Sequence, residues 1–515
     1  MSNQTPSILK MGEKRERRSL SRIETRILDP MYINDNTASF QLPTTGILDK
    51  NTTLILPVLG ADANQKLPLT TGILSLIKNA RLSCNGVIIS NAEEVGMMAS
   101  IRLLFRPIEI REHRDACELG THTGIEQSTN RSTLITESKV RITGNYNTAN
   151  PQAGTLDSGY QLTNNAGTSP HYYVKLQHLF PELLNNVMIP LGLLSHPLQL
   201  DITFSGNGIV NGAHTASGVS QERIIAVSGQ SITGCTVQQS QVKLKLDLLY
   251  FNDGTMSKLA QQATSKEGIQ FVYGDYSLVR TQIQALNPAP AGTAFGTQTA
   301  TRNIGYSNQI LRHLLIATPK TTFGANAQDY GGTGLTNKYS STCGVSTRGE
   351  KIQITINSIP IYPRAIDNEA QLQSELSDIF NTPIHIPACA TNKNCAYGDA
   401  FTAPPAYGIA VNAIDANNRG FSNDTIHGYS NDILEGELCY KGFDFTKPIY
   451  DPASGQIIKS NYSGSGIRIN ENPVMIEYER QCNATENAGI DMYIFGCIER
   501  QFILRNGLIY VTGSA

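Results

Sequence analysis

The sequence predicts an all-β protein built from two antiparallel β-sandwich domains in tandem. Apolar and polar residues alternate strictly in Val242–Leu248, a period of two that is typical of a half-buried strand. Asn252-Asp253-Gly254 then breaks the apolar run as a turn, and a new strand pattern begins at Ile269–Tyr273. The 515 residues also exceed what one core holds, since cores stop growing near ~250–300 residues. One β unit therefore ends near residue 251 and another begins near 269.

This reading divides the chain into four parts. The linker has helical character from Met256 to Thr264, and Gly268 ends it. The predicted parts are an N-terminal arm (1–30), a first β unit (31–251), the linker (252–268) and a second β unit (269–515).

Composition narrows the class of protein. Only 16% of residues are charged, and no apolar window approaches the ~20 residues of a membrane helix. Residues 1–26 lack the apolar core of a secretory signal, so we expect a soluble protein that folds inside the cell and is not secreted. Nine cysteines without metal-binding spacing fit a reducing compartment. Cys84 and Cys497 lie in strand patterns and are expected to be buried free thiols.

The arm concentrates positive charge. Residues 8–28 hold seven basic and three acidic residues, a net of +4 in a chain whose total is −2. Leu20, Ile23 and Ile27 are spaced for one face of a short helix that Asp29-Pro30 stops. The arm is either a solvated terminus or a segment that orders against a partner, in which case removing residues 1–26 leaves folding unchanged. Its candidate assembly residues are Lys14, Arg15, Arg17, Arg18, Leu20, Arg22, Ile23, Arg26 and Ile27.

The first unit has strand patterns at Thr52–Val58, Ala80–Cys84 and Leu198–Phe204. Asn85-Gly86 predicts a tight turn after the second of these. A helix should follow, with Asn91 as N-cap and Pro107 at its end. It would place Glu93 and Glu94 in its first turn and Val95, Met98, Ile101 and Phe105 inward. Residues 120–170 and 205–220 are polar loops.

The second unit has the same kind of strand, turn and helix patterns as the first, but the two sequences do not align as a repeat. A helix capped by Asp367 or Asn368 should place Leu372, Leu376, Ile379 and Phe380 on one face. Loops are expected at Phe323–Glu350 and over 388–465. Strands are expected at Ile310–Ile316, Ile352–Ile356, Val474–Tyr478, Met492–Phe495 and Phe502–Val511, the last with a turn at Asn506-Gly507.

No catalytic, cofactor or metal site emerges, and we predict that the chain is not an enzyme. His113 and His122 lie near Glu112 and Asp115, but Arg111 and Arg114 interleave, which favours an ion-pair-rich loop over a metal site. His385 fits a strand residue better than a ligand. Nothing in the sequence distinguishes Asp275 and Asp247 from other carboxylates as a catalytic pair. No nucleophile elbow, HExxH motif or phosphate-binding loop occurs.

Four stretches of the chain carry a family resemblance. They are Leu179-Phe-Pro-Glu-Leu through Leu198–Phe204, the junction Leu246–Phe251, Gly72–Leu82 with Asn85-Gly86, and the terminal Arg500–Val511. In the order of these stretches and in the kind of pattern that each shows, the chain resembles double jelly-roll major capsid proteins of double-stranded DNA viruses, of the polinton-like virus and virophage kind. The resemblance extends from about residue 35 to 512.

The resemblance implies that each unit is an eight-stranded jelly roll and that three chains form a pseudo-hexameric capsomer. Such capsomers tile an icosahedral shell around double-stranded DNA, so the expected location is the virion. The implied partners are other copies of the chain, neighbouring capsomers, and minor capsid and penton proteins. The genome or an inner membrane would be reached only through the arm, and no cofactor is implied.

Two other classes of protein remain as alternatives. A lectin-like or carbohydrate-active β-sandwich protein would use the Gly-, Thr- and Asn-rich loops, although the absence of Trp and of a secretory signal argues against it. A fibre or spike protein would show a fibrous repeat, and the sequence has none.

Overall fold

The computed structural model describes the chain in several separate ranges. The described residues are 20–34, 36–59, 65–66, 71–106, 110–120, 171–204, 225–226, 236–237, 239–284, 295–319, 347–362, 364–367, 369–380, 440–446, 466–470, 473–483 and 489–513.

Two sheets enclose the core of the first unit. One has the strand order β1-β13-β5-β12, with β4 beside β13 and β9 beside β5, and the other has the order β2-β3-β10-β7-β8. The first comprises β1 (Leu20–Leu28), β4 (Ile47–Leu48), β5 (Thr53–Leu59), β9 (His171–Lys175), β12 (Thr236–Val237) and β13 (Lys243–Phe251). The second comprises β2 (Tyr32–Ile33), β3 (Thr37–Gln41), β7 (Ile77–Cys84), β8 (Val87–Glu93) and β10 (Leu198–Phe204), while β6 (Gln65–Lys66) and β11 (Ile225–Ala226) pair separately.

The second unit also has two sheets. Their orders are β14-β22-β16-β19, with β20 beside β16 and β23 beside β22, and β15-β21-β17-β18. The first comprises β14 (Ile269–Ile283), β16 (Ile310–Ala317), β19 (Tyr440–Asp444), β20 (Ile467–Arg468), β22 (Ile490–Arg505) and β23 (Leu508–Gly513). The second comprises β15 (Phe295–Ile304), β17 (Thr347–Ile356), β18 (Ile359–Pro360) and β21 (Val474–Asn483). Every strand pair among the described residues is antiparallel.

The predicted period-two strands form as expected. In β10 the burial alternates at every residue, so Leu198, Leu200, Ile202 and Phe204 point into the core. Both Asn-Gly turns also form, because Asn and Gly tolerate the positive φ angles that a type I′ turn requires. Asn85 has φ 46° before β8, and Asn506 has φ 51° before β23.

Short helices connect the strands. The linker helix α7 (Asp253–Thr264) begins where the Asn252 side chain accepts a hydrogen bond from the Thr255 backbone N–H. In α8 (Glu369–Phe380) Leu376 is buried, as predicted, while Asn368 and the Leu372 side chain lie outside the described residues. The other helical segments are η3 (Gly72–Leu76), α1 (Val95–Arg102), η4 (Leu103–Phe105), η5 (Ile110–Asp115), α2 (Ala116–Leu119), α4 (Leu176–Leu179), α5 (Pro181–Leu184), η6 (Leu191–Leu193) and η7 (Gln239–Gln241).

Two helix predictions were wrong in position or type. Asn91 is not an N-cap, because residues 87–93 continue as β8 and α1 begins only after Glu94, so neither Glu93 nor Glu94 lies in its first turn. The predicted inward residues of that helix are nevertheless buried: Val95, Met98, Ile101 and Phe105. The predicted helix around Ile23 and Ile27 is instead strand β1, because this segment pairs with β13 along its length.

The loop predictions have a mixed outcome. Residues 121–170 and 205–220 lie outside the described residues, as does most of 388–465. Within the last range, however, Tyr440–Asp444 forms β19 and pairs with β16. Thr347–Ile356 forms β17, which begins inside the stretch predicted to be a loop.

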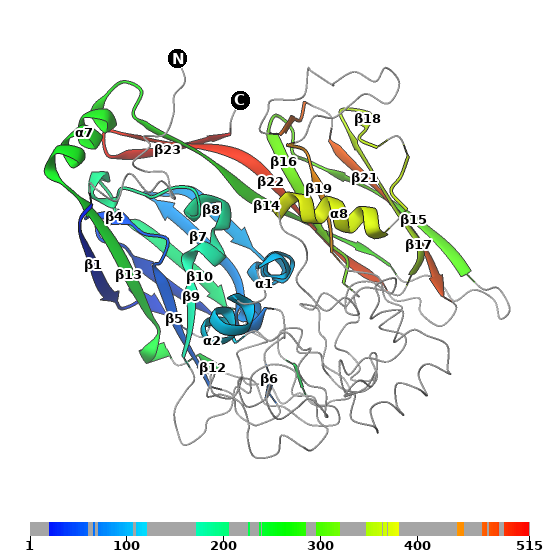
Figure 1. The fold of residues 1–515 in the computed structure, drawn as a ribbon, viewed down its shortest axis with the longest axis horizontal. Helices are drawn as coiled ribbons and strands as arrows, with labels where there is room; N and C mark the ends of the chain where they lie inside the picture. The colour runs from blue at the N-terminus through cyan, green and yellow to red at the C-terminus, as the bar shows by residue number, and fades with distance from the viewer. Residues whose placement is uncertain are drawn as a thin grey trace.

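The two units are joined by shared strands as well as by the linker. Strand β14 pairs with β22 over the whole length of β14, from Ile269↔Leu504 to Ile283↔Ile490, and both strands pass from one unit to the other (Figure 1). Phe271 and Phe502 belong to the core of the first unit, whereas Ile283 and Ile490 belong to the core of the second. The division at 252–268 stays a prediction, and the hydrophobic packing crosses it.

Candidate functional site

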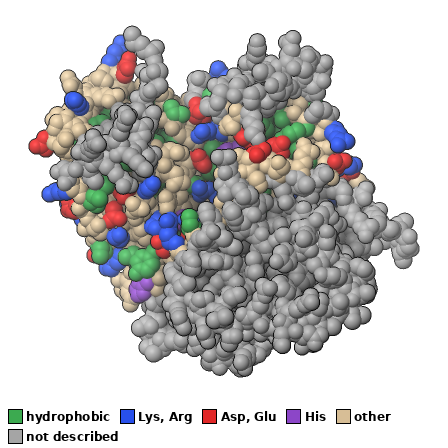
Figure 2. All heavy atoms as spheres, in the orientation of Figure 1, with side chains coloured by type: hydrophobic (Ala, Val, Ile, Leu, Met, Phe, Trp, Pro, Cys, Tyr) green, Lys and Arg blue, Asp and Glu red, His purple; other side chains and the backbone are tan. Residues whose placement is uncertain are grey.

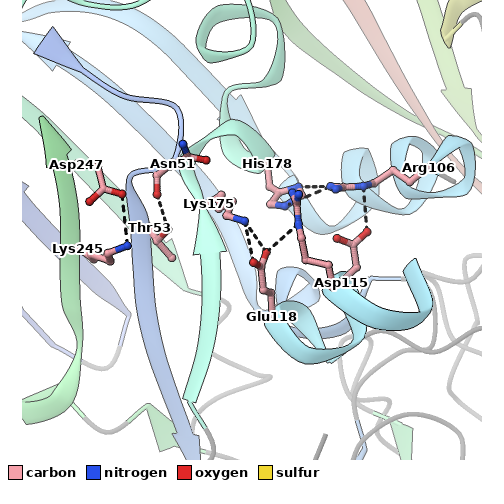
Figure 3. Close-up of polar contacts among 10 residues, drawn as sticks. Asn51, Thr53, Arg106, Asp115, Glu118, Lys175, His178, Lys245 and Asp247 are labelled. Atoms are coloured by element: carbon pink, nitrogen blue, oxygen red, sulfur yellow. Dashed lines mark hydrogen bonds and ion pairs between the residues drawn. The ribbon is translucent and has the colours of Figure 1, made fainter. Parts of the chain in front are cut away.

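A group of ion pairs lies within the first unit. Arg106 Nε lies 3.0 Å from Asp115 Oδ2, and Lys175 Nζ lies 2.7 Å from Glu118 Oε1 (Figure 3). The Lys175 contact ties α2 to the first sheet, and the Arg106 contact ties the end of η5 to the residue after η4. Ion pairs were predicted around Arg114 and Asp115, and Arg114 Nε also lies 3.5 Å from Glu118 Oε2, but the segment is helical and not the predicted loop. The side chain of His113 and all of His122 lie outside the described residues.

His178 lies within this group of charged side chains. Arg106 lies 3.4 Å from both of its ring nitrogens, and its burial, followed by the nearby Arg106 charge, lowers its pKa well below 6.5. The imidazole is therefore neutral and packed among cations. Across the described ranges no cluster of three or more His, Cys, Asp or Glu side chains is arranged to hold a metal ion. No described helix has the length and apolar character to cross a membrane.

A second polar group joins the two units. The Asp275 carboxylate, on β14, accepts a 2.6 Å hydrogen bond from Ser90 Oγ on β8, and Arg500 Nη1 lies 3.2 Å from Asp275 Oδ2. Burial is the main cause that raises the Asp275 pKa to about 6, against the opposing effect of Arg500. Asp247 has other partners, since Thr25 Oγ1 donates to it at 2.7 Å. The two carboxylates therefore do not form a pair.

Both predicted free thiols are buried. Cys84 lies in β7 and Cys497 in β22, and neither forms a disulfide. Burial is the first cause that raises the pKa of each thiol, so both stay protonated at neutral pH. They are packing residues in the cores and not nucleophiles.

Strand β1 brings five of the nine predicted arm residues into one edge strand. They are Leu20, Arg22, Ile23, Arg26 and Ile27, and the strand pairs antiparallel with β13 from Leu20↔Phe251 to Leu28↔Leu244. Lys14, Arg15, Arg17 and Arg18 lie outside the described residues. Because residues 20–26 belong to the sheet, removing residues 1–26 should no longer leave folding unchanged, which corrects the expectation for the arm.

Strand β1 places charged side chains on the core side of its sheet and isoleucines on the solvent side, the reverse of an ordinary core strand. Residues directly opposite each other in a sheet share a face, so Arg26 and Glu24 lie on the side of Leu246 and Leu248, which are core residues. Ile23 and Ile27 lie on the solvent side, 60% and 66% exposed.

Further exposed apolar side chains follow β1 in the sequence. Met31 and Tyr32 are 61% and 56% exposed, so residues 23–32 hold four of the large hydrophobic side chains most open to solvent in the described chain. We call Ile23, Ile27, Met31 and Tyr32 the β1 stripe. Figure 2 shows hydrophobic, basic and acidic side chains mixed in small groups over the described part of the first unit. A protein contact on such a mixed surface would bury these apolar side chains.

Sequence reasoning found Ile23 and Ile27 but assigned them to a helix, and it missed Met31 and Tyr32. The available signal was the alternation of Arg22, Glu24 and Arg26 with Ile23, Thr25 and Ile27. A period of two with β-branched residues predicts a strand, and it competes with the three- and four-residue spacing of Leu20, Ile23 and Ile27.

Comparison with known proteins identifies the fold. No family model matches the sequence, and no curated protein sequence matches it. A chain of the Sputnik virophage structure, solved by cryo-EM, matches with a TM-score of 0.53 and 11% identity, over 96% of this chain and 89% of that chain. The major capsid protein of mavirus matches with a TM-score of 0.48 and 11% identity, over 100% of this chain and 96% of that chain. The Faustovirus major capsid protein matches with a TM-score of 0.48 and 9% identity, over 94% and 90% of the two chains.

The Sputnik virophage match bears on the resemblance found in the sequence. The Sputnik virophage match covers nearly the whole of both chains, and the sheets are antiparallel in both units. The predicted resemblance is therefore confirmed at the level of fold: this chain has the double jelly-roll fold of virophage-type major capsid proteins.

Proposed function

We propose that this chain is a major capsid protein, a structural subunit without catalytic activity. Three copies would form a pseudo-hexameric capsomer, and capsomers would tile an icosahedral shell around double-stranded DNA. The observation that carries the proposal is the whole-chain fold match to a chain of the Sputnik virophage particle. Two sandwiches per chain support it, because three chains around a threefold axis present six similar sandwiches in a near-hexagonal outline.

The proposal places the protein in the virion. Its partners would be further copies of itself, neighbouring capsomers, and minor capsid and penton proteins. Residues 1–19 would be the remaining assembly arm, with Lys14, Arg15, Arg17 and Arg18 available to a neighbouring protein, an inner membrane or the genome. Since β1 belongs to the sheet, the arm proper would begin N-terminal to Leu20.

The first test is the mass of the purified full chain. Size-exclusion chromatography with light scattering should give three times the chain mass of 56.0 kDa. Electron microscopy of concentrated protein should then show hexagonal outlines or shells. A stable monomer at micromolar concentration, with no particle under any assembly condition, would contradict the proposal. A specific ligand on a glycan array would favour the lectin-like alternative.

A further inference from the structure

The outer edge of β1 is open within the described chain. Strand β1 ends its sheet, with β13 on one side and no described strand on the other. An edge strand presents unpaired N–H and C=O groups that can pair with another strand. The register is irregular only between Leu20 and Arg22, so residues 22–28 form seven residues of regular strand.

We propose that β1 pairs antiparallel with β1 of a second copy of this chain, around a twofold axis at Thr25. The first sheets of the two copies would then become one continuous sheet. In this register Glu24 lies opposite Arg26 of the second copy, and Ile23 lies opposite Ile27 of the second copy. Thr25 lies opposite itself. Opposite charges, β-branched pairs and Thr–Thr pairs are all favourable neighbours across antiparallel strands.

The charges of β1 distinguish this register from its neighbours. Pairing centred on Glu24 would place Glu24 opposite itself and Arg22 opposite Arg26. Pairing centred on Arg26 would place Arg26 opposite itself. Both alternatives set like charges against each other, which is destabilising. A shift by one residue would place charged residues opposite isoleucines and mix the two faces. Pairing centred on Ile23 would also set Glu24 opposite Arg22, but it would use only residues 22–24 of the regular strand. The register at Thr25 pairs Glu24 with Arg26 and uses all seven regular residues, with Arg22 opposite Leu28.

Within one subunit the same side chains remain partly or largely exposed to solvent. Glu24 meets Arg26 and Arg22 along its own strand, with the three side chains 30%, 39% and 65% exposed. The hydrogen bond from Arg26 is the largest cause that lowers the Glu24 pKa, so Glu24 is ionised at neutral pH. Ile23 and Ile27 point to solvent. A second β1 would cover part of these isoleucines and give Glu24 and Arg26 another partner each.

Charge also decides between classes of partner. Nucleic acid or an anionic membrane calls for a face of one sign. Beside β1, Lys243 is paired with Asp29, and Lys245 lies 3.4 Å from Asp247. A face of balanced charge with an apolar stripe suits protein, and the self-complementary pattern of β1 suits a copy of itself.

This inference rests on the proposed capsid function only for its place in an assembly. A twofold contact uses the same patch on both copies and cannot close a threefold ring. It would therefore join one trimer to the next and would not build the trimer. Trimer formation and β1 pairing can be measured separately.

The test uses charge reversal in the full-length protein. Glu24→Arg carries only arginines at positions 24 and 26, and Arg26→Glu carries only glutamates. Each variant alone should remain trimeric but lose association between trimers, by tenfold or more, in sedimentation velocity runs. An equimolar mixture should associate again, because each arginine then meets a glutamate. The double variant E24R/R26E should associate like the wild type, and Glu93→Arg, an exposed charge change on β8, should have no effect.

Crosslinking provides a second readout that does not depend on charge. Under oxidation Thr25→Cys should give disulfide-linked dimers, whereas Ile23→Cys should not, because it faces Ile27 of the second copy. If the mixture fails to restore association and Thr25→Cys fails to crosslink while trimers persist, the pairing is overturned. Residues 1–19 or another protein would then cover this edge, and the proposed function would stand. If the chain is monomeric, the proposed function falls, and the crosslink still decides the pairing.

Discussion

An acid and a base form an ion pair both at the junction between the units and at the β1 edge, but the acid is buried at the junction and partly exposed at the edge. At the junction, the carboxylate of Asp275 is 4% exposed and binds Arg500 and Ser90. At the edge, Glu24 is 30% exposed and binds Arg26. Breaking a buried pair is costly because a charge is left without a partner, whereas an exposed pair contributes little and exchanges readily with water.

The difference separates two roles within one chain. Groups at the junction are buried and connect the two units, and their loss should appear in the free energy of unfolding. Groups at the β1 edge are already solvated, and their loss should appear in association between copies. Four predictions test this separation, in order of the expected effect on stability.

The largest effect should come from removing β1 itself. A chain lacking residues 1–28 loses the pairing from Leu20↔Phe251 to Leu28↔Leu244. Since each backbone hydrogen bond contributes roughly 0.5–1.5 kcal/mol, we expect a loss of more than about 3 kcal/mol in denaturant unfolding. A chain lacking only residues 1–19 is the control, and it should keep the wild-type midpoint. Equal midpoints for the two truncations would show that β1 is dispensable to the fold.

The second effect is a pH dependence caused by Asp275. Its folded-state pKa of about 6 lies above the ordinary value of 3.8, so the folded protein holds the proton more tightly than the unfolded chain. This contribution to stability is complete below pH 3.8 and is lost as pH rises through about 6. The loss is on the order of 3 kcal/mol. The unfolding free energy of Asp275→Asn should lack this fall between pH 4 and pH 6. An unchanged slope in the variant would assign the dependence to another group.

The third effect is steric and concerns Gly274 on β14. A Cβ at this position would lie 2.6 Å from Cys497 Sγ and 3.3 Å from the Glu182 Cβ of the first unit. Gly274→Ala should therefore lower the unfolding free energy by roughly 1–3 kcal/mol, as overpacking usually does. Gly305→Ala is the matched control, since a Cβ there meets nothing within 4 Å. Two variants of equal stability would mean that the junction yields without strain.

Much of the fold could be predicted because its signals are local. Strict alternation identified β10, and Asn-Gly located two turns. The same alternation located the strand Ile352–Ile356, whose isoleucines lie in the core of the second unit. The linker helix was predicted from Met256, but it begins at Asp253, inside the predicted turn.

The remaining features depend on contacts distant in sequence. Ser90 and Asp275 are 185 residues apart, and no local pattern announces their hydrogen bond. The end of β8 was missed because its pairing Asn79↔Glu93 keeps the strand extended past the apolar residues. For β1, the apolar spacing fitted a helix and a strand equally well, and only pairing with β13 decides between them.

The smallest effect on stability should come from the β1 stripe. Ile27→Thr keeps a β-branched side chain in the strand and removes apolar surface from a position that is 66% exposed. The unfolding free energy should change by no more than about 0.5 kcal/mol. Leu28→Thr, one residue later, is the contrast, because Leu28 packs against the first core and its loss should cost more. In sedimentation experiments the order should reverse, with Ile27→Thr weakening association between copies more than Leu28→Thr does. If Ile27→Thr lowered stability and left association unchanged, the outward face of β1 would belong to the fold and not to assembly.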